Sequence, residues 1–561
     1  ERHMKKIKPR AIIVGAISVL AILFIGFFGL CVPLNVKSGR MWALLIFTSF
    51  AAVLAGRALC GIKDFGFVTY TKSTGSKGRN KKVTKFNFNF KPYIIPAVFL
   101  CIIVLITVFG STLFNAEKYS EILSVSDEDF MKDLSESVGT DSIALMDTAS
   151  AQMLGDREIG SLSNVVSQFN VSEDYTQIDF KGKPIKVSAL EYAGYFKWTN
   201  NKDTGVCGYV IVDPVSMSAS YKDCEGMRYV PSAYFFENAK RHIWLKYPTV
   251  MFGNLHFEID EDGNPYYIAS VYEKTISLFG GKTVTGCIIL NPITGEVQKL
   301  ALEDIPNWVD VVFDGDLICM QYNWHGTLQN GYMNSLIGKK GCKQVTTYVS
   351  DGNEDNAPVS DYGYVAKDGD IWIYTGITSV NGDSSNIGFL LANERTGESH
   401  YYSVAGADEK SAMSAAEGEV QEKGYQASFP SLINVSGNPT YIMVLKDSGG
   451  LVKLYAAVNV EQYNLVATAS TQADCLKKYK EIIGVKETDE KTDDTQNVEI
   501  TVSQIRYIDI DGNTYIYIIS DDEKIYKAKA VSHEEMLLIK EGDKIKIEHK
   551  NSVIKSCQKV S

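Results

Sequence analysis

The sequence predicts an α+β protein that begins with three transmembrane helices and ends in a small β-barrel. Three observations predict this fold class. The first 114 residues of the 561-residue chain hold three long apolar runs that do not recur later. A pattern of a helix followed by a β-hairpin then repeats along the middle of the chain. Residues 498–561 alternate short apolar strands with Gly- and Asp-containing turns, which is typical of small barrels.

The apolar runs are residues 11–34, 41–62 and 93–114. A helix rises 1.5 Å per residue, so about 20 apolar residues cross about 30 Å of hydrocarbon. Each run meets that length, and we expect each to span a lipid bilayer. The three spans would form a membrane domain over residues 1–114.

Basic residues predict the orientation of these spans. Lys and Arg precede the first run and fill the loop 63–92, and such residues collect on the cytoplasmic side of a membrane. The sequence thus predicts a membrane protein with a cytoplasmic N-terminus and 63–92 loop, and with residues 115–561 outside. The net charge of −11 argues against nucleic acid as a partner.

Four segments of the middle region open with a Gly-containing turn, continue as an apolar strand and return on a second strand. The turns include Gly182, Gly263, Gly369 and Gly437. Strands bounded by Gly, Pro, Asn and Asp predict hairpins. We expect helices over 141–153, 235–246, 411–423 and 472–483 to cover the sheets. The predicted modules are residues 115–250, 251–345 and 346–484, and the last of these contains two units.

The second segment carries the words Asp-Gly-Asn-Pro-Tyr-Tyr and Asn-Pro-Ile-Thr-Gly-Glu-Val within Glu258–Leu300. This order resembles PepSY domains, and the whole chain resembles uncharacterised bacterial three-span membrane proteins with tandem PepSY-like extracytoplasmic modules. The resemblance implies a location in the bacterial plasma membrane and small α+β modules that restrain peptidases or take part in envelope interactions. An acidic, polar stretch over 485–497 predicts a linker to the C-terminal barrel of SH3-like or OB-like type.

Motifs for catalysis and metal binding are missing from the sequence. The seven His show no metal-ligand spacing, and neither HExxH nor Gly-x-Ser-x-Gly occurs. We therefore expect no catalytic, cofactor-binding or metal-binding residues. Cys207 and Cys224 lie in one predicted hairpin region and either form a disulfide or remain free thiols.

Aromatic residues are the best candidates for contacts with a partner, because Tyr and Trp combine contact area with a polar tip. The candidates are Trp308, Trp324, Tyr266, Tyr267, Tyr401 and Tyr402. Both Trp are expected in loops between modules, with a place in the core as the alternative.

The sequence predicts a non-enzymatic scaffold, adaptor or receptor that binds an envelope protein or cell-wall component, and an oligomer is possible. The alternative is a modulator of an extracytoplasmic peptidase, or a hydrolase whose site assembles from distant residues.

Overall fold

The computed structural model describes residues 9–59, 69–74, 80–85, 93–134, 145–348, 359–360, 362–380, 385–485, 496–510, 513–522, 524–530, 536, 538–550 and 553–559. The chain forms two compact units, a large unit over 1–484 and a small unit over 485–561. The predicted linker 485–497 lies mostly outside the described residues.

The N-terminal helices correct the prediction of three transmembrane spans. Helix α1 (Pro9–Phe24) has 16 residues and continues as a π-helix over Ile25–Gly29. In helix α2 (Gly39–Leu59) the apolar part runs over Gly39–Ala55. Helix α3 (Ile94–Phe109) ends at Gly110, and α4 (Thr112–Ser120) follows at a bend of 47°. Among the described residues no single helix is long and apolar enough to cross a membrane, and only the bent α3–α4 pair passes by length and composition.

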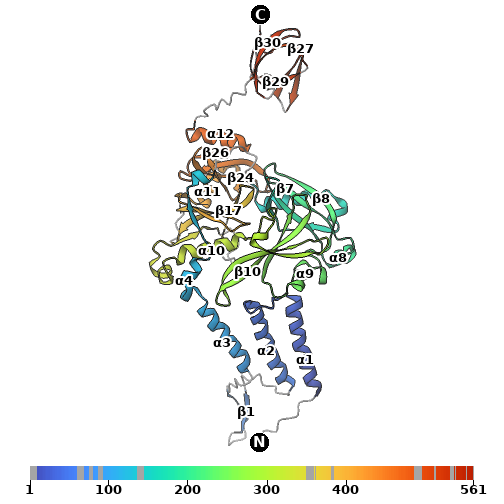
Figure 1. Cartoon of the computed structure of the whole chain (residues 1–561), viewed down its shortest axis with the longest axis vertical. Coiled ribbons are helices and arrows are strands. Elements are labelled where there is room, and N and C mark those ends of the chain that lie inside the picture. The colour runs from blue at the N-terminus through green and yellow to red at the C-terminus, as the bar shows by residue number, and fades with distance from the viewer. Residues whose placement is uncertain are drawn as a thin grey trace. The chain divides into compact units, whose positions relative to one another are not determined.

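This finding removes the basis for the expected membrane domain, for the plasma-membrane location and for the assignment of cytoplasmic and outside segments. Run length alone misled the prediction, because an apolar run does not show where helical hydrogen bonding breaks. Helix α1 packs against α2 and α2 against α3 (Figure 1). Their outer faces are apolar and exposed, for example at Leu20 and Ile95, each 64% exposed. The described part of the 63–92 loop is a hairpin of β1 (Thr69–Thr74) and β2 (Asn80–Lys85).

Four larger sheets, antiparallel except where β3 pairs with β20, lie in the rest of the large unit, together with the short pairs β14 (Thr347–Tyr348) with β15 (Val359–Ser360) and β18 (Ser385–Asn386) with β21 (Gly406–Ala407). Sheet 1 contains β4 (Phe169–Val171), β5 (Thr176–Phe180), β6 (Lys183–Tyr192), β7 (Val206–Asp213) and β8 (Ser218–Met227). Sheet 2 contains β9 (Phe252–Ile259), β10 (Pro265–Ile276), β11 (Gly280–Leu290) and β12 (Val297–Ala301). Sheet 3 contains β3 (Ser126–Glu128), β13 (Lys343–Val345), β16 (Gly363–Lys367), β17 (Asp370–Ser379), β19 (Gly388–Asn393) and β20 (Ser399–Tyr402). Sheet 4 contains β22 (Gln426–Ala427), β23 (Ser431–Val435), β24 (Asn438–Lys446), β25 (Val452–Asn459) and β26 (Val466–Ala469).

The predicted hairpins occur in all four sheets, as the pairs β6–β7, β10–β11, β17–β19 and β24–β25. Each is preceded by a turn with a glycine at positive φ, from +79° at Gly182 to +85° at Gly263. The second strand of each hairpin ends at, or one residue before, a side chain whose oxygen accepts a backbone N–H two or three residues later. These side chains are those of Asp213, Asn291, Asn393 and Asn459. Such turns satisfy backbone donors where the chain leaves the sheet, so the repeat in sequence is a repeat of turn chemistry.

Helices cover the sheets and cross between the predicted modules. They are α5 (Phe130–Asp133), α6 (Thr148–Gly160), α7 (Ser163–Val166), α8 (Tyr195–Asn201), α9 (Ala239–Lys246), α10 (Gly315–Leu328), α11 (Glu409–Glu419) and α12 (Gln472–Ile482). Strand β3 belongs to the first predicted module by sequence, yet it pairs with β20 of sheet 3. Lys446 of sheet 4 forms an ion pair with Asp147, which caps α6. The sheets therefore share one body.

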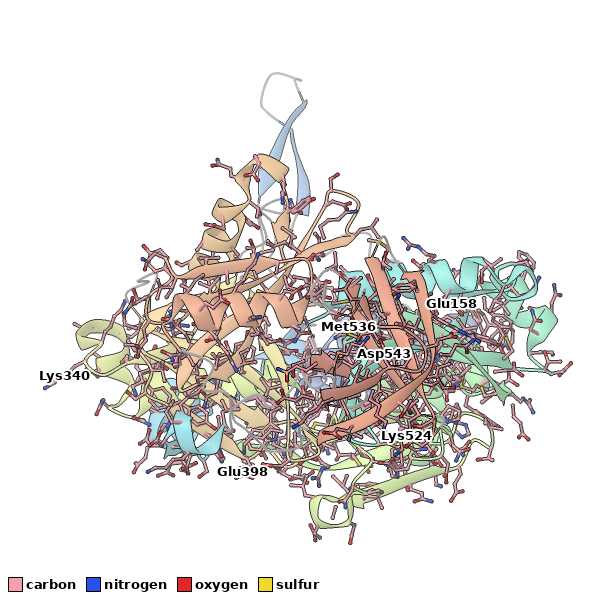
Figure 2. The ribbon with its side chains drawn as sticks, turned by 90° about the horizontal axis from the view of Figure 1, so that it is seen from above. Glu158, Lys340, Glu398, Lys524, Met536 and Asp543 are labelled. Atoms are coloured by element: carbon pink, nitrogen blue, oxygen red, sulfur yellow. The ribbon has the colours of Figure 1, made fainter. Side chains whose placement is uncertain are left out.

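The small unit is a closed five-stranded barrel, as the sequence predicts. Its strands are β27 (Gln496–Ile510), β28 (Asn513–Ser520), β29 (Ile525–Lys529), β30 (Lys544–Lys550) and β31 (Val553–Lys559). Met536 is fully buried in its core, and Asp543 pairs with Lys559 at 2.6 Å. Figure 2 labels Met536 and Asp543, together with Lys524 from the turn before β29.

Candidate functional site

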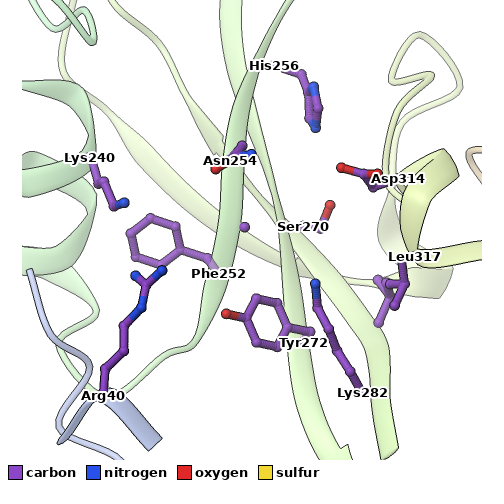
Figure 3. Close-up of a pocket in the computed structure, with 12 residues that line it drawn as sticks. Arg40, Lys240, Phe252, Asn254, His256, Ser270, Tyr272, Lys282, Asp314 and Leu317 are labelled. Atoms are coloured by element: carbon purple, nitrogen blue, oxygen red, sulfur yellow. The ribbon is translucent and has the colours of Figure 1, made fainter. Parts of the chain in front are cut away.

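A polar pocket of about 210 Å³ lies where β9, β10 and β11 meet α2, α9 and the start of α10 (Figure 3). We call it the cationic pocket, because three of its lining residues are cations and one is an acid. It is lined by Arg40, Lys240, Phe252, Gly253, Asn254, His256, Ser270, Tyr272, Lys282, Val284, Asp314 and Leu317. Figure 3 shows Arg40 and Lys240 reaching in beside Phe252, with Lys282 and Ser270 between them and Asp314.

The segment between α1 and α2 places Arg40 at this pocket. Leu34 N–H donates to the Pro248 carbonyl at 2.7 Å, and Trp244 of α9 donates its indole N–H to the Val32 carbonyl at 3.0 Å. Arg241 of α9 donates to the Phe28 carbonyl at 3.0 Å. These bonds hold the start of α2 against α9, so Arg40 and Lys240 reach the pocket from neighbouring helices.

Two lysines lie opposite each other on the β10–β11 hairpin, which lines one side of the cationic pocket. Lys274 of β10 pairs in register with Lys282 of β11. Like charges directly opposite on neighbouring strands are destabilising. Burial lowers the pKa of the Lys282 ammonium, although Asp314 and Asp316 act in the other direction. Burial also lowers the pKa of Lys274, and the charge on Lys282 adds to that effect.

No described residue forms an ion pair with Lys240, Lys274, Lys282 or Arg40 at 4.0 Å or less. The Lys282 ammonium lies over the Tyr272 ring, with Nζ 4.4 Å from the ring centroid. Four cations therefore converge on one region that has Asp314 and Asp316 nearby but no ion pair within 4.0 Å among the described residues. Such an arrangement favours an anion as ligand, because each ammonium has hydrogen-bond donors to spare.

His256 and Asp314 form the far end of the pocket. Burial lowers the pKa of His256, and the Asp314 carboxylate opposes that shift. Asp314 also caps α10 by accepting the Asp316 N–H at 2.9 Å. These contacts fix Asp314 at the helix start.

The aromatic residues predicted to contact a partner do not gather in this pocket. Tyr267, Tyr401 and Tyr402 are buried, with at most 7% of their surface exposed, so they belong to the core rather than to a binding surface. Tyr402 donates its hydroxyl to Asp133, and the Tyr401 hydroxyl donates to the Ile387 carbonyl at 3.1 Å. Tyr401 and Tyr402 are neighbours in β20, so they point to opposite faces of the sheet, and both are buried because each face packs on a core cluster.

The other three candidates are partly buried. Tyr266 lies against Trp308 with ring centroids 4.7 Å apart, and both pack on the core beneath sheet 2. Trp324 lies in helix α10 and meets the Tyr119 ring edge-on at 4.8 Å, which corrects the expectation that it lies in a loop. The two rings meet because α10 packs against α4, the helix that contains Tyr119.

No sequence motif predicted a role in ligand binding for Arg40, Lys240, Lys274 or Lys282. One signal could have found the last two. The pair Gly280-Gly281 indicates a nearby reversal, and the turn at residues 277–279 just before it pairs Ile276 with Gly280 and sets Lys274 opposite Lys282. Nothing in the sequence shows that Arg40 and Lys240 approach the same hairpin.

Metal and disulfide chemistry find no support in the described part of the chain. No group of three or more His, Cys, Asp or Glu there could hold a metal ion. Cys207 and Cys224 are free thiols. The Glu258 carboxyl is fully buried and accepts the N–H groups of Asp310 and Val311 at 2.9 and 3.0 Å, so its oxygens serve the fold.

Comparisons with known proteins identify no relative. No family model and no curated protein matches the chain. An apocarotenoid oxygenase from Synechocystis aligns at 9% identity over 54% of this chain and 62% of its own length, with a TM-score of 0.16. A levansucrase from B. megaterium aligns at 10% identity over 80% of this chain and 98% of its own, with a TM-score of 0.18. Scores this low do not indicate a shared fold and carry no functional argument.

Proposed function

We propose that this chain is a binding protein, a receptor or adaptor, whose partner presents an anionic group to the cationic pocket. The observation that carries the proposal is the opposed pair Lys274 and Lys282 beside Arg40 and Lys240, with no ion-pair partner among the described residues. A phosphate or carboxylate bound between these cations would remove their mutual repulsion.

The size of the pocket supports a small group rather than a large ligand. Its volume of about 210 Å³ is below that of most drug-sized ligand sites, which measure about 300–1,000 Å³. The group would be a phosphate, a carboxylate or a short chain that carries one, on a small molecule or on a protein or cell-wall component.

The experiment is calorimetric titration of the full chain with inorganic phosphate, pyrophosphate and citrate at low and high NaCl. We expect saturable binding of at least one anion that weakens with salt, because exposed charges are screened. Lys282→Met removes the charge while keeping much of the side-chain volume, and we expect it to weaken binding by about tenfold or more, which is about 1.4 kcal/mol.

Lys299→Met is the matched control. Lys299 is an exposed lysine on β12 of the same sheet and does not line the pocket. Its replacement should leave anion binding unchanged. Equal losses in the two variants, or no saturable binding of any of the three anions, would overturn the proposal.

A further inference from the structure

A second pocket, of about 270 Å³, shares Asn254, His256 and Asp314 with the cationic pocket. Its lining includes four carboxyl groups, those of Glu173, Asp174, Asp314 and Glu394, and contains no Lys or Arg. We call it the acidic pocket. An acidic cluster alone is not a binding site, since carboxylates gather on many solvated surfaces.

Three buried polar atoms of residues that line this pocket have no hydrogen-bond partner, namely Tyr175 Oη, Gln177 Nε2 and Glu394 Oε2. The Gln177 side chain is 3% exposed and its Nε2 is unpaired, and the Glu394 side chain is 2% exposed and its Oε2 is unpaired. Buried polar groups are almost always hydrogen-bonded, and leaving one unpaired costs about 1–3 kcal/mol. The unpaired Glu394 oxygen needs a donor from a ligand, whereas the Gln177 amide N–H is itself a donor and does not select for a cation.

The rest of the lining defines the chemistry of that ligand. Four carboxyl groups without a lining Lys or Arg exclude an anion. The absence of a metal-binding group among the described residues argues against a bare metal ion. Tyr362 and Tyr364 add aromatic surface, and aromatic faces attract cations.

The protein already places one ammonium in this environment. Lys186, which is 2% exposed, holds its Nζ 5.1 Å from the centroid of the Tyr364 ring. Burial raises the pKa of the Glu394 carboxyl and the Lys186 ammonium opposes that shift, so a second ammonium beside the unpaired Oε2 would favour the ionised carboxyl further. We infer that the acidic pocket binds the protonated amine of a small organic molecule, with Glu394 on its floor and Glu173 and Asp174 at its exposed mouth.

Calorimetric titration of the full chain with putrescine tests the inference, and 1,4-butanediol serves as the uncharged probe of similar shape. We expect saturable binding of putrescine and none of butanediol. Glu394→Gln should weaken putrescine binding by about tenfold or more. Because Glu394 is buried, Glu173→Gln at the exposed mouth provides a second variant that leaves the fold intact, with a smaller loss expected.

Glu422→Gln is the matched control for the mouth, because Glu422 is an exposed glutamate outside the pocket. It should not change putrescine binding. Equal binding of butanediol would overturn the amine assignment. A lack of saturation with putrescine would overturn it as well, and would mean that water alone fills the cavity.

Discussion

The β10–β11 and β24–β25 hairpins have the same turn chemistry and differ in how much of their length other elements cover. In β24 the side chains of Tyr441 and Met443 enter one core cluster, and those of Ile442 and Val444 enter another on the opposite face. The far end of β10–β11 instead carries Tyr272, Lys274 and Lys282. A hairpin covered on both faces becomes core, and an uncovered end becomes available for a site.

Sheets 2 and 4 also differ at the second residue pair counted from the turn that precedes β10 and β24. Sheet 2 has Glu258 there, which pairs with Tyr266, and sheet 4 has Asn434, which pairs with Pro439. Both side chains are buried and bonded to backbone groups, since Asn434 donates to the Leu134 carbonyl at 2.9 Å. The acid makes the stability of sheet 2 depend on pH, and the amide does not.

The largest expected effect sharpens the contrast in cover. Tyr441 is fully buried and donates its hydroxyl to the Ala407 carbonyl at 3.1 Å. Tyr441→Ala should lower the free energy of unfolding by about 3–5 kcal/mol. Tyr272→Ala on the uncovered hairpin should cost about 1 kcal/mol or less. Urea unfolding followed by tryptophan fluorescence measures both, and equal losses would contradict the contrast.

The next effect tests the ionisable group in sheet 2. Burial raises the pKa of Glu258 and the pKa of Asp310, and the charge of Glu258 raises that of Asp310 further. A carboxyl with a raised pKa in the folded state stabilises the fold fully at a pH below its unfolded pKa, and this contribution is lost as the pH rises from about 4 toward the folded pKa.

Asp310→Asn removes one titrating group. The retained side-chain oxygen can still accept the Asp179 N–H, at 2.9 Å in the native chain. The free energy of unfolding of the native chain should therefore fall more steeply than that of the variant as the pH rises above about 4, by up to about 1.4 kcal/mol per pH unit. Parallel pH profiles of the two chains would rule out a raised pKa at Asp310.

A smaller effect compares the turns that follow strands β11 and β25. Asn291 accepts N–H groups from Ile293 and Thr294 at 2.9 and 3.0 Å. Asn459 accepts the Gln462 N–H at 2.8 Å and also donates to the Tyr479 hydroxyl at 2.9 Å in the core. Asn459→Ala should cost about 2–3 kcal/mol and Asn291→Ala about 1 kcal/mol. A reversed order in thermal unfolding would mean that burial does not set the cost of losing this turn.

The smallest effect concerns the opposed lysines. Lys274→Met should raise the free energy of unfolding of the ligand-free chain by about 0.2–1 kcal/mol, since it removes a like-charge pair across β10 and β11. Lys299→Met should give no gain. The difference is measured at low salt and should shrink as NaCl is added. A loss of stability in Lys274→Met would show that the lysines already have a partner.

The sequence by itself determined the hairpins, because turn chemistry is local. A glycine at positive φ such as Gly437, followed by a strand and an Asn such as Asn459, needs only nearby residues to specify the reversal. The small barrel was predictable for the same reason, since short strands and Gly or Asp turns recur at close spacing.

Only the tertiary structure decided where the helices break, which aromatic residues are core and which charges converge. The bend between α3 and α4 and the place of Trp324 in α10 depend on packing between elements far apart in the chain. Arg40, Lys240 and Lys282 meet because the segment before α2 is hydrogen-bonded to α9 and the residues after it. Burial and the approach of distant charges arise only in the folded chain, so a sequence pattern cannot encode them in one place.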